Sequence, residues 1–596
     1  MSKLKPNKLR KKQSPQDIEQ QKHINMIRMI FSHMGFAIVP GIERKNFTFQ
    51  GIRSEFDDIF YLENVIIIME YTVSSETGTH LKGKLPIYGE ISEKHSDFLK
   101  FMESNEEFKS LKSILNDTIL RKYSRKEIQL RILYASKETI SPEHKKLAPS
   151  NVHFFDYSIV KYFSIISKVA RKSTRYEFLD FANIQYNQFG DNIKKSATET
   201  RDDFVGHILP EDRSYFTYKI VTFYIDAQSL LKRAYVLRND SWRNVENIEL
   251  YQRLLIPKKI KQMRQYLAQQ KRVFINNIIV TISADDITLY DKDKNILPME
   301  DDGEIAQLDS KGIPVQISIS NKANIIGIID GQHRIFAYHE GDDAHEDSIA
   351  KLRIDQNLLV TGIILPKNTQ KDENLMFQAQ LFLEINATQQ GASSKLKQTI
   401  DSILSPASAT SISKYLINKL NESGPLRDKF EITISDEHKI KTSSIVSFAL
   451  NLLVRPYSKE SLWAKWDDQD KDKILVNDKP DMKKLLEYKT FCERVLTDFF
   501  SSISKAIIQK KWQISTRKND GILNVTVING FINFLRDIVA ENQHDKIKTY
   551  TDQFAKLNKF EFDKYKSSQY RKMGKDLYTH CFSPSSADSK GGTPNS

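Results

Sequence analysis

Residues 325–334 read IIGIIDGQHR, an apolar run that stops at Asp-Gly and continues into a polar segment. The run predicts a buried strand, the glycine predicts a tight turn, and the residues that follow predict a helix that ends near Gly341 as its cap. The first turn of a helix offers unpaired N–H groups and the positive end of the helix dipole to an anion. The sequence therefore predicts a phosphate site at this turn.

Each side chain of the turn has a possible role in such a site. Gly331 permits close approach of the backbone, and Gln332 and His333 can donate hydrogen bonds. Arg334 can hold a phosphate by two parallel hydrogen bonds, and Asp330 can hold the loop or a metal ion. The alternative is an ordinary strand-to-helix turn whose polar side chains are solvated.

The five residues from Asp330 to Arg334 match the DGQHR motif letter for letter. On this motif the chain resembles the DGQHR-domain family over residues 215–400. That family includes DndB-type regulators of DNA phosphorothioation and ParB-like proteins of DNA-modification systems. Three further segments are similar to the family: residues 251–253 (YQR), a helical pattern over 256–267, and residues 382–389 (FLEINATQ).

The order of elements around the motif is also similar to the ParB and sulfiredoxin fold. A helix is followed by a strand at residues 276–280 and then by the motif. In that fold the equivalent strand-to-helix turn binds nucleotide phosphates. The resemblance implies a central α+β domain of this kind, with a site for ATP or another NTP formed by Asp330, Gly331, Gln332, His333 and Arg334.

A second group of polar residues lies in residues 51–72, where two strand-like runs flank a short turn. If Glu63 and Asn64 form a two-residue hairpin loop, residue numbers across the ladder sum to a constant. That register places Asp57 opposite Glu70 and Glu55 opposite Thr72, with both pairs on the same face of the hairpin.

Two carboxylates that face each other repel, so the pair of Asp57 and Glu70 needs a cation between them or a raised pKa on one partner. Oxygen ligands of this kind suit Mg²⁺ or Mn²⁺. Such a metal could activate water against a phosphodiester.

This pattern resembles the PD-(D/E)XK nuclease superfamily, which has an acidic residue on one strand and Glu-x-Lys on the next. A preceding amphipathic helix at residues 16–34 also fits, with Glu19 as a possible further acid. The resemblance implies an N-terminal restriction-endonuclease-like α/β domain with Asp57 and Glu70 as metal ligands. Thr72 stands where the lysine is expected. The alternatives are a domain that only binds DNA and a surface hairpin with scattered acids.

Lys82 or Lys84 could supply the missing charge from further along the chain. Both lie in GTHLKGK at residues 78–84, which matches the start of a P-loop. Leu85 replaces the hydroxyl residue of that loop, and Pro86 with Gly89 argues against a long following helix. We therefore reject a P-loop and expect the two lysines at a basic edge beside the hairpin or in a solvated loop.

The composition indicates a multi-domain protein of the cytoplasm. The chain has 596 residues, 40% of them hydrophobic, and a net charge of +13 from 89 Lys and Arg against 76 Asp and Glu. This surplus favours polyanions as partners. No apolar run is long enough for a bilayer, so we expect no membrane contact. Cys492 and Cys581 are too few for a disulfide framework. Neither looks catalytic, and no histidine and cysteine spacing predicts zinc.

Changes in charge, polarity and apolar spacing along the chain predict six segments. The acid-free arm with Lys3, Lys5 and Lys8 could neutralise DNA phosphates or act as a solubilising tail. From about residue 400 apolar residues recur at helical spacing, which predicts a helical C-terminal region. The expected segments are a basic disordered arm (1–14), a nuclease-like domain (15–175), a connector (176–214), a DGQHR domain (215–400), a helical domain (401–582) and a disordered tail (583–596).

Together these features predict a DNA-acting protein of a bacterial DNA-modification or anti-phage defence system. The first hypothesis is a metal-dependent DNA nuclease coupled to a nucleotide-binding DGQHR domain, with double-stranded DNA as substrate and Lys82 or Lys84 in catalysis. The second is a catalytically inactive DNA-binding regulator or recruitment factor of the DndB type. The third is an NTPase that supports a partner protein in DNA base modification. The sequence leaves the oligomeric state open.

Overall fold

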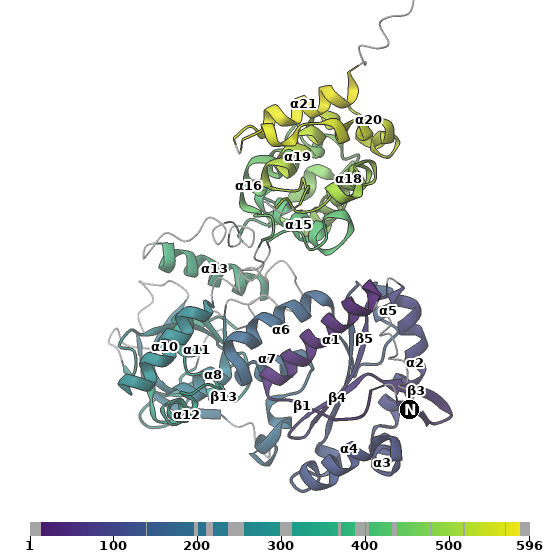
Figure 1. Cartoon of the computed structure of the whole chain (residues 1–596). Coiled ribbons are helices and arrows are strands. Elements are labelled where there is room, and N and C mark those ends of the chain that lie inside the picture. The colour runs from purple at the N-terminus through teal and green to yellow at the C-terminus, as the bar shows by residue number, and fades with distance from the viewer. Residues whose placement is uncertain are drawn as a thin grey trace, which may run out of the picture. The chain divides into compact units, whose positions relative to one another are not determined.

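A computed structural model gives the architecture of the chain (Figure 1). It describes residues 14–43, 45–74, 76–138, 140–195, 201–209, 218–236, 255–298, 313–367, 371–387, 398, 400, 404–431, 438–476, 479–516, 519–566 and 568–583. Within these residues the protein is a mixed α/β structure with a five-stranded sheet, an eight-stranded sheet, two small sheets and a helical C-terminal region. The predicted mixture of α/β sheets and a helical end is confirmed at this level.

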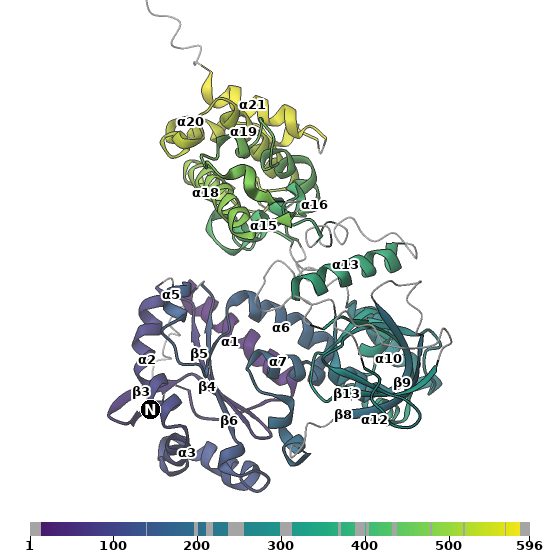
Figure 2. The ribbon, with the colours of Figure 1, turned by 180° about the vertical axis from the view of Figure 1, so that it is seen from behind.

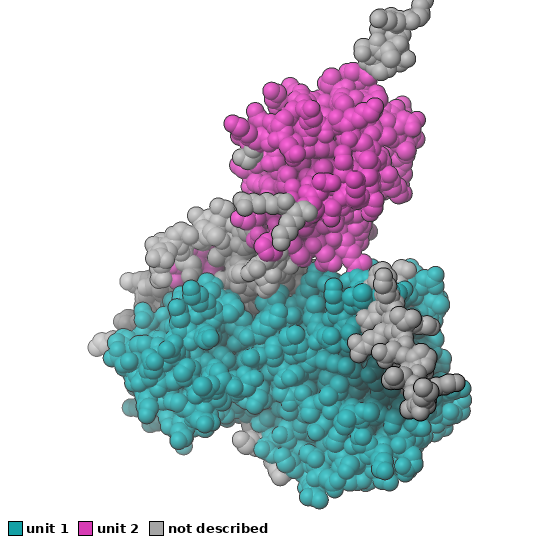
Figure 3. Space-filling view, in the orientation of Figure 1, with its two compact units in different colours: residues 1–245, 254–374 teal, residues 246–253, 375–596 magenta. Residues whose placement is uncertain are grey.

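The chain divides into two compact units (Figure 3). Unit 1 comprises residues 1–245 and 254–374, and unit 2 comprises residues 246–253 and 375–596. Unit 1 thus holds both large sheets. The boundary at 374/375 falls inside the segment 215–400 predicted as the DGQHR domain.

The first half of unit 1 is a mixed sheet in the strand order β1-β4-β5-β6-β7. Strands β4 and β5 form an antiparallel hairpin, while β5, β6 and β7 run parallel. The elements of this half are α1 (Pro15–Met34), β1 (Ala37–Ile38), β2 (Lys45–Phe49), β3 (Ile52–Phe56), β4 (Asp58–Leu62), β5 (Val65–Thr72), α2 (Thr77–Glu93), α3 (His95–Ser104), α4 (Lys109–Ile114), β6 (Gln129–Ser136), α5 (Pro142–Lys145), β7 (Val152–Phe154), α6 (Tyr157–Ala170) and α7 (Arg175–Phe181).

Strand β5 is buried along its whole length because helices cover both faces of the sheet. On one face α1 packs beside α6 (Figure 1). Phe31 of α1 stacks there on Phe60 of β4. On the other face Ile66 and Ile68 join a hydrophobic core with Leu81 of α2. Alternate residues of β5 therefore face different helices.

Helix α2 corrects the expectation that Pro86 and Gly89 prevent a long helix, because it runs through both. A proline inside a helix costs about 3 kcal/mol. Leu81, Ile87 and Ile91 of the same helix are fully buried, and each buried side chain of this size contributes about 1.5–3 kcal/mol. Burial of this apolar face outweighs the proline.

The second half of unit 1 is built on the eight-stranded sheet, in the order β10-β14-β11-β15-β9-β8-β13-β12 (Figure 2). Strand β8 lies within the segment 176–214 predicted as a connector, and the predicted strand at 276–280 is β11. The elements are β8 (Arg201–Leu209), β9 (Lys219–Asp226), α8 (Ala227–Arg233), β10 (Ala234–Val236), α10 (Pro257–Gln270), β11 (Ile278–Ser283), β12 (Ile287–Tyr290), β13 (Ile313–Ser320), β14 (Ile326–Asp330), α11 (Gln332–Phe336), α12 (Glu346–Asp355) and β15 (Asn357–Leu365).

The predicted strand, tight turn and helix are present as β14, Gly331 and α11. Gly331 has φ +100°, a left-handed conformation that favours glycine. The helix ends at Phe336, so the predicted continuation to Gly341 is wrong. The guanidinium of Arg264 binds the carbonyl oxygens of Ala337 and His339 and thereby withdraws them from a helical ladder.

The residues after α11 connect the two halves of unit 1. The carboxylate of Glu340 accepts hydrogen bonds from Arg175 at 2.8 and 2.9 Å. Its backbone N–H donates to Ser173 Oγ at 3.0 Å, and its carbonyl accepts from Lys172 N at 3.0 Å. Arg171 adds an ion pair to Asp342 at 3.4 Å, so the segment after the strand-turn-helix element is bonded to the first half of the unit at two residues.

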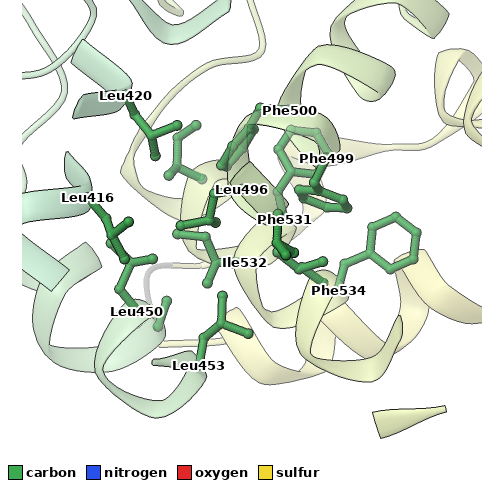
Figure 4. Close-up of a cluster of buried hydrophobic side chains, with 14 of the residues drawn as sticks. Leu416, Leu420, Leu450, Leu453, Leu496, Phe499, Phe500, Phe531, Ile532 and Phe534 are labelled. Atoms are coloured by element: carbon green, nitrogen blue, oxygen red, sulfur yellow. The ribbon is translucent and has the colours of Figure 1, made fainter. Parts of the chain in front are cut away.

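Unit 2 is helical, and Figure 4 shows its core of leucine, isoleucine and phenylalanine side chains. The helical C-terminal region predicted from about residue 400 is confirmed. The elements of the C-terminal region are α13 (Lys371–Ala387, which begins in unit 1), α15 (Ala409–Glu422), α16 (Ser443–Ile445), α17 (Asn451–Leu453), β16 (Leu475–Val476), β17 (Lys479–Pro480), α18 (Met482–Ala506), α19 (Val525–Ala540), α20 (Thr551–Ala555) and α21 (Tyr570–Phe582).

The helical unit holds both cysteines, and Cys492 and Cys581 are buried and unbonded to each other. Burial raises the pKa of both thiols, to about 12 for Cys581, so neither is a reactive thiolate at neutral pH. Trp463 and Trp466 pack against Tyr488 of α18. Of the helices described, none combines the length and the apolar character needed to cross a bilayer.

Candidate functional site

The hairpin predicted at residues 51–72 forms with the expected register. Strands β4 and β5 are joined by Glu63 and Asn64, and their paired residues, such as Asp58 with Met69, sum to the predicted constant. Asp57 lies directly before β4, so its side chain is on the same face as that of Glu70. Oδ2 of Asp57 accepts a hydrogen bond from Tyr71 N at 2.8 Å, which fixes it beside β5.

The second predicted pair, Glu55 with Thr72, is wrong. Glu55 belongs to β3, which pairs with β2 in a separate two-stranded sheet, opposite Asn46. The main sheet begins after Asp57, so Asp57 is the acid that stands opposite Glu70 in the register, whereas the charge of Glu55 acts on Glu70 from β3. Thr72 is buried at the end of β5, and its Oγ1 accepts a hydrogen bond from Ser74 N.

Lys84 supplies the positive charge that Thr72 lacks. From helix α2 its Nζ lies 2.8 Å from Oε1 of Glu70 and donates to the carbonyl oxygen of Glu55 at 3.0 Å. Its side chain is 16% exposed. Lys82, two residues earlier, is exposed to solvent on another face of α2. The structure thus brings Lys84 to the carboxylates and leaves Lys82 outside.

Burial makes this carboxylate pair costly to ionise. Glu70 is 4% exposed, and loss of solvation raises its pKa to about 8, with Asp57 raising it further and Lys84 opposing the shift. Burial also raises the pKa of Asp57, against the hydrogen bond from Tyr71 N and the charge of Lys84. Raised carboxyl pKa values in one place are typical of sites that bind a cation or transfer a proton.

Two residues near Glu70 were missed by sequence reasoning. His80 precedes Lys84 by one helical turn, and its Nε2 lies 3.9 Å from Oε1 of Glu70. Tyr134 is the partner of Glu70 on β6, and its hydroxyl is 2.6 Å from Nδ1 of His80. The four-residue spacing of His80 and Lys84 was a usable signal, whereas the position of Tyr134 depends on a pairing about sixty residues away.

On the opposite face of the same strands, the acidic side chain connects the sheet to α1. Asp58 accepts two hydrogen bonds from Arg28, each 2.8 Å long, and one from the Tyr71 hydroxyl at 2.7 Å. This bidentate pair fixes α1 to the sheet. Glu19, suggested as a further acid, forms an ion pair with Lys137 and is nearly half exposed. It is not part of the group around Glu70.

The acids around Glu70 are oxygen donors of the kind that a divalent cation binds. Oε2 of Glu70 is buried and has no hydrogen-bond partner among the described residues, and Asp57 is its neighbour. No cluster of three His, Cys, Asp or Glu side chains that could hold a metal occurs in the described part of the chain. Mg²⁺ commonly binds one or two carboxylates and several waters, so two acids are sufficient.

The second predicted site, the turn from Asp330 to Arg334, has its polar side chains directed at the protein. Nη2 of Arg334 donates to Oδ2 of Asp330 at 2.8 Å and to the carbonyl oxygen of Asn277 at 2.9 Å. Nε2 of His333 accepts from the N–H of Ile256 at 3.1 Å. The side chains of this turn are thus held by the protein instead of being solvated.

Burial also governs the electrostatics of the turn. It lowers the pKa of His333 to about 4, so the ring is neutral at physiological pH. Gln332 is buried, and its Oε1 and the Nε of Arg334 have no hydrogen-bond partner among the described residues. The YQR segment at 251–253, the end of the FLEINATQ segment, the basic arm before residue 14 and the tail after residue 583 lie outside the described residues.

Comparisons with models of known protein families, with curated proteins and with solved structures gave no match for this chain.

Proposed function

We propose that this protein is a metal-dependent nuclease that cuts double-stranded DNA. In this proposal Asp57 and Glu70 bind Mg²⁺ or Mn²⁺, and Lys84 neutralises the charge on the phosphate that is cut. The observation that supports it most is the contact of 2.8 Å between Lys84 Nζ and Glu70 Oε1, next to Asp57 on the same sheet face. In this proposal Lys84 of α2 takes the role of the lysine expected at the position of Thr72.

The chemistry follows from these side chains. A bound divalent metal would polarise a phosphate oxygen and lower the pKa of a water molecule bound to it. Asp57 is held by Tyr71 N in a fixed orientation, so little reorganisation is needed when a ligand binds. Lys84 sits in a partly buried position, where its charge is less screened by water than that of an exposed lysine. Its Nζ uses two of its three N–H donors for Glu70 and Glu55, so the third can bind a phosphate oxygen while the contact with Glu70 is kept.

The same electrostatics support a cation at this position. Two neighbouring carboxyl groups with raised pKa values are a poor arrangement for folding alone. Lys84 provides one positive charge for two acids, and a divalent ion would balance the group. The setting we propose is DNA modification or anti-phage defence, with the turn from Asp330 to Arg334 as a nucleotide-responsive element and further defence proteins as partners.

The test is cleavage of supercoiled plasmid by the full chain with Mg²⁺ or Mn²⁺, with and without ATP. The wild-type protein should produce nicked or linear DNA, and Asp57→Asn should produce neither. Asp58→Asn is the matched control, since Asp58 binds Arg28 on the opposite face. It should keep cleavage activity while it remains folded. Equal cleavage by wild type and Asp57→Asn would exclude this site.

A second candidate is a DNA-binding regulator or recruitment factor without catalysis. Thr72 at the position of the expected lysine favours it. In this case the group around Lys84 would contact phosphates only, and binding would weaken with salt in a sequence-independent manner. Salt-sensitive DNA binding by wild type without new DNA ends, under every metal and nucleotide condition, would favour this candidate over the nuclease.

A third candidate is an NTPase centred on the turn after β14. The buried Gln332 Oε1 and Arg334 Nε, which lack partners among the described residues, favour a ligand there. Arg334 would then exchange Asp330 for a phosphate. ATP binding and phosphate release by the full chain, both lost in Arg334→Ala, would support it, and ATP binding that is unchanged in Arg334→Ala would exclude it.

A further inference from the structure

Glu70 is flanked by two side chains from consecutive turns of α2. Lys84 touches Oε1 at 2.8 Å, and Nε2 of His80 approaches the same oxygen at 3.9 Å. Both contacts are to Oε1, whereas Oε2 has no hydrogen-bond partner among the described residues. The carboxyl group is therefore held from one side.

The orientation of His80 is set by Tyr134. The two residues meet because Tyr134 pairs with Glu70 across β5 and β6, so its side chain is on the face that α2 covers. Its hydroxyl lies 2.6 Å from Nδ1 of His80. This short hydrogen bond fixes the ring and directs Nε2 toward Glu70.

The geometry also selects one form of the neutral imidazole ring. If Tyr134 donates to Nδ1, the proton of the ring is on Nε2 and faces an acceptor oxygen of Glu70. With Glu70 ionised, as it would be with a metal ion bound, the other tautomer would direct the lone pair of Nε2 at a charged oxygen, which is repulsive. The Nε2–H form is therefore favoured. The separation of 3.9 Å is wider than a hydrogen bond, so His80 faces Oε1 here without bonding to it.

We propose that His80, held by Tyr134, is a positioning residue that fixes Oε1 of Glu70 together with Lys84 and so presents Oε2 to a divalent metal ion. Tyr134, His80 and Glu70 form a chain in which each group orients the next. Residues that orient a metal ligand in this way typically change metal affinity by about 10–100-fold. This inference rests on the proposed function, because it assigns a role in the same site.

The test is a Mn²⁺ titration of the full chain by calorimetry, which does not depend on cleavage. His80→Ala and Tyr134→Phe should each raise the half-saturating Mn²⁺ concentration by about tenfold. The double variant should be no weaker than His80→Ala, since Tyr134 acts through His80. His80→Gln retains a donor near the position of Nε2 and should recover most of the affinity.

Tyr123→Phe is the matched control, because it removes a hydroxyl that binds Glu63 at the other end of the β4–β5 hairpin. It should leave Mn²⁺ affinity unchanged. Nitrogen NMR of histidine-labelled protein should show the Nε2–H form of His80 in wild type and a mixture of forms in Tyr134→Phe.

The outcomes separate the two claims. Wild type that neither binds Mn²⁺ nor cuts DNA overturns the proposed function and this inference with it. Wild type that binds Mn²⁺, with His80→Ala and Tyr134→Phe of equal affinity, overturns the inference alone. Additive effects in the double variant would also overturn it, because they would mean that Tyr134 and His80 act separately.

Discussion

The two candidate sites of unit 1 differ in how completely their charged side chains are paired. Around Glu70 two acids share one lysine, and a buried carboxyl oxygen has no partner among the described residues. At the turn after β14 the main charges are paired, since Arg334 binds Asp330 and the carbonyl oxygen of Asn277. A cation would balance the acids around Glu70. The contacts of Arg334 already connect β14 to the start of β11.

The group around Glu70 is thus costly for folding, whereas the turn after β14 supports folding. Buried groups with raised carboxyl pKa values persist where they have a chemical use. Paired groups such as Arg334 and Asp330 also occur simply because they fasten one element to another. We therefore rank the carboxylate group above the better-matched motif as the place of catalysis, and three predictions test that ranking.

The largest expected effect is on catalysis, from two lysines that are two residues apart. Lys84→Ala should lower the cleavage rate by about 10²–10³-fold, the usual cost of losing one preorganised charge or donor at a reacting group. Lys82→Ala removes an exposed charge from the same helix and should change the rate little. Rates are compared on supercoiled plasmid at saturating Mg²⁺. Similar rates for the two variants would remove Lys84 from the site.

The next effect is the pH dependence of metal binding. The pKa of Glu70 is raised to about 8, so below that pH the metal must displace a proton from it. The half-saturating Mn²⁺ concentration should rise about tenfold for each unit that the pH falls from 8 to 6, and it should level off above 8. Calorimetric titration at several pH values measures this. A half-saturating concentration that is constant from pH 6 to 8 would mean that Glu70 is ionised throughout.

The smallest effect is on stability, where the two sites should respond with opposite signs. Replacing Glu70 and Lys84 together by Gln and Met removes a buried ion pair and should leave the free energy of unfolding unchanged or raise it by about 1–4 kcal/mol. Replacing Asp330 and Arg334 by Asn and Met removes the bond to Asn277 and should lower it by about 1–3 kcal/mol. Urea unfolding of the full chain measures both. Equal destabilisation by the two double variants would contradict the distinction.

Local sequence patterns predicted the parts of these sites that depend on neighbours in the chain. The loop at Glu63 and Asn64 fixed the register of β4 and β5, and the register placed Asp57 beside Glu70. The Asp-Gly step predicted the tight turn, which forms with Gly331 in a left-handed conformation. Helices in the C-terminal region followed from apolar spacing, as in α18 and α19.

Features that depend on distant contacts were not predictable in this way. Pro86 argued against α2, but burial of Leu81 and Ile87 against the sheet decides in favour of the helix. The end of α11 is set by Arg264, which comes from α10 about seventy residues earlier. Which of Lys82 and Lys84 reaches Glu70 depends on how α2 is oriented on β5. The position of Tyr134 beside Glu70 depends on the pairing of β5 with β6.

The most direct test of the central claim is plasmid cleavage with Mg²⁺ or Mn²⁺ by wild type, Glu70→Gln and Lys84→Ala at pH 8, with each variant shown to be folded. We expect nicked or linear DNA with wild type, a rate lower by about 10²–10³-fold with Lys84→Ala, and no product with Glu70→Gln. Intact plasmid with wild type under every metal condition, or full activity of Glu70→Gln, would contradict it.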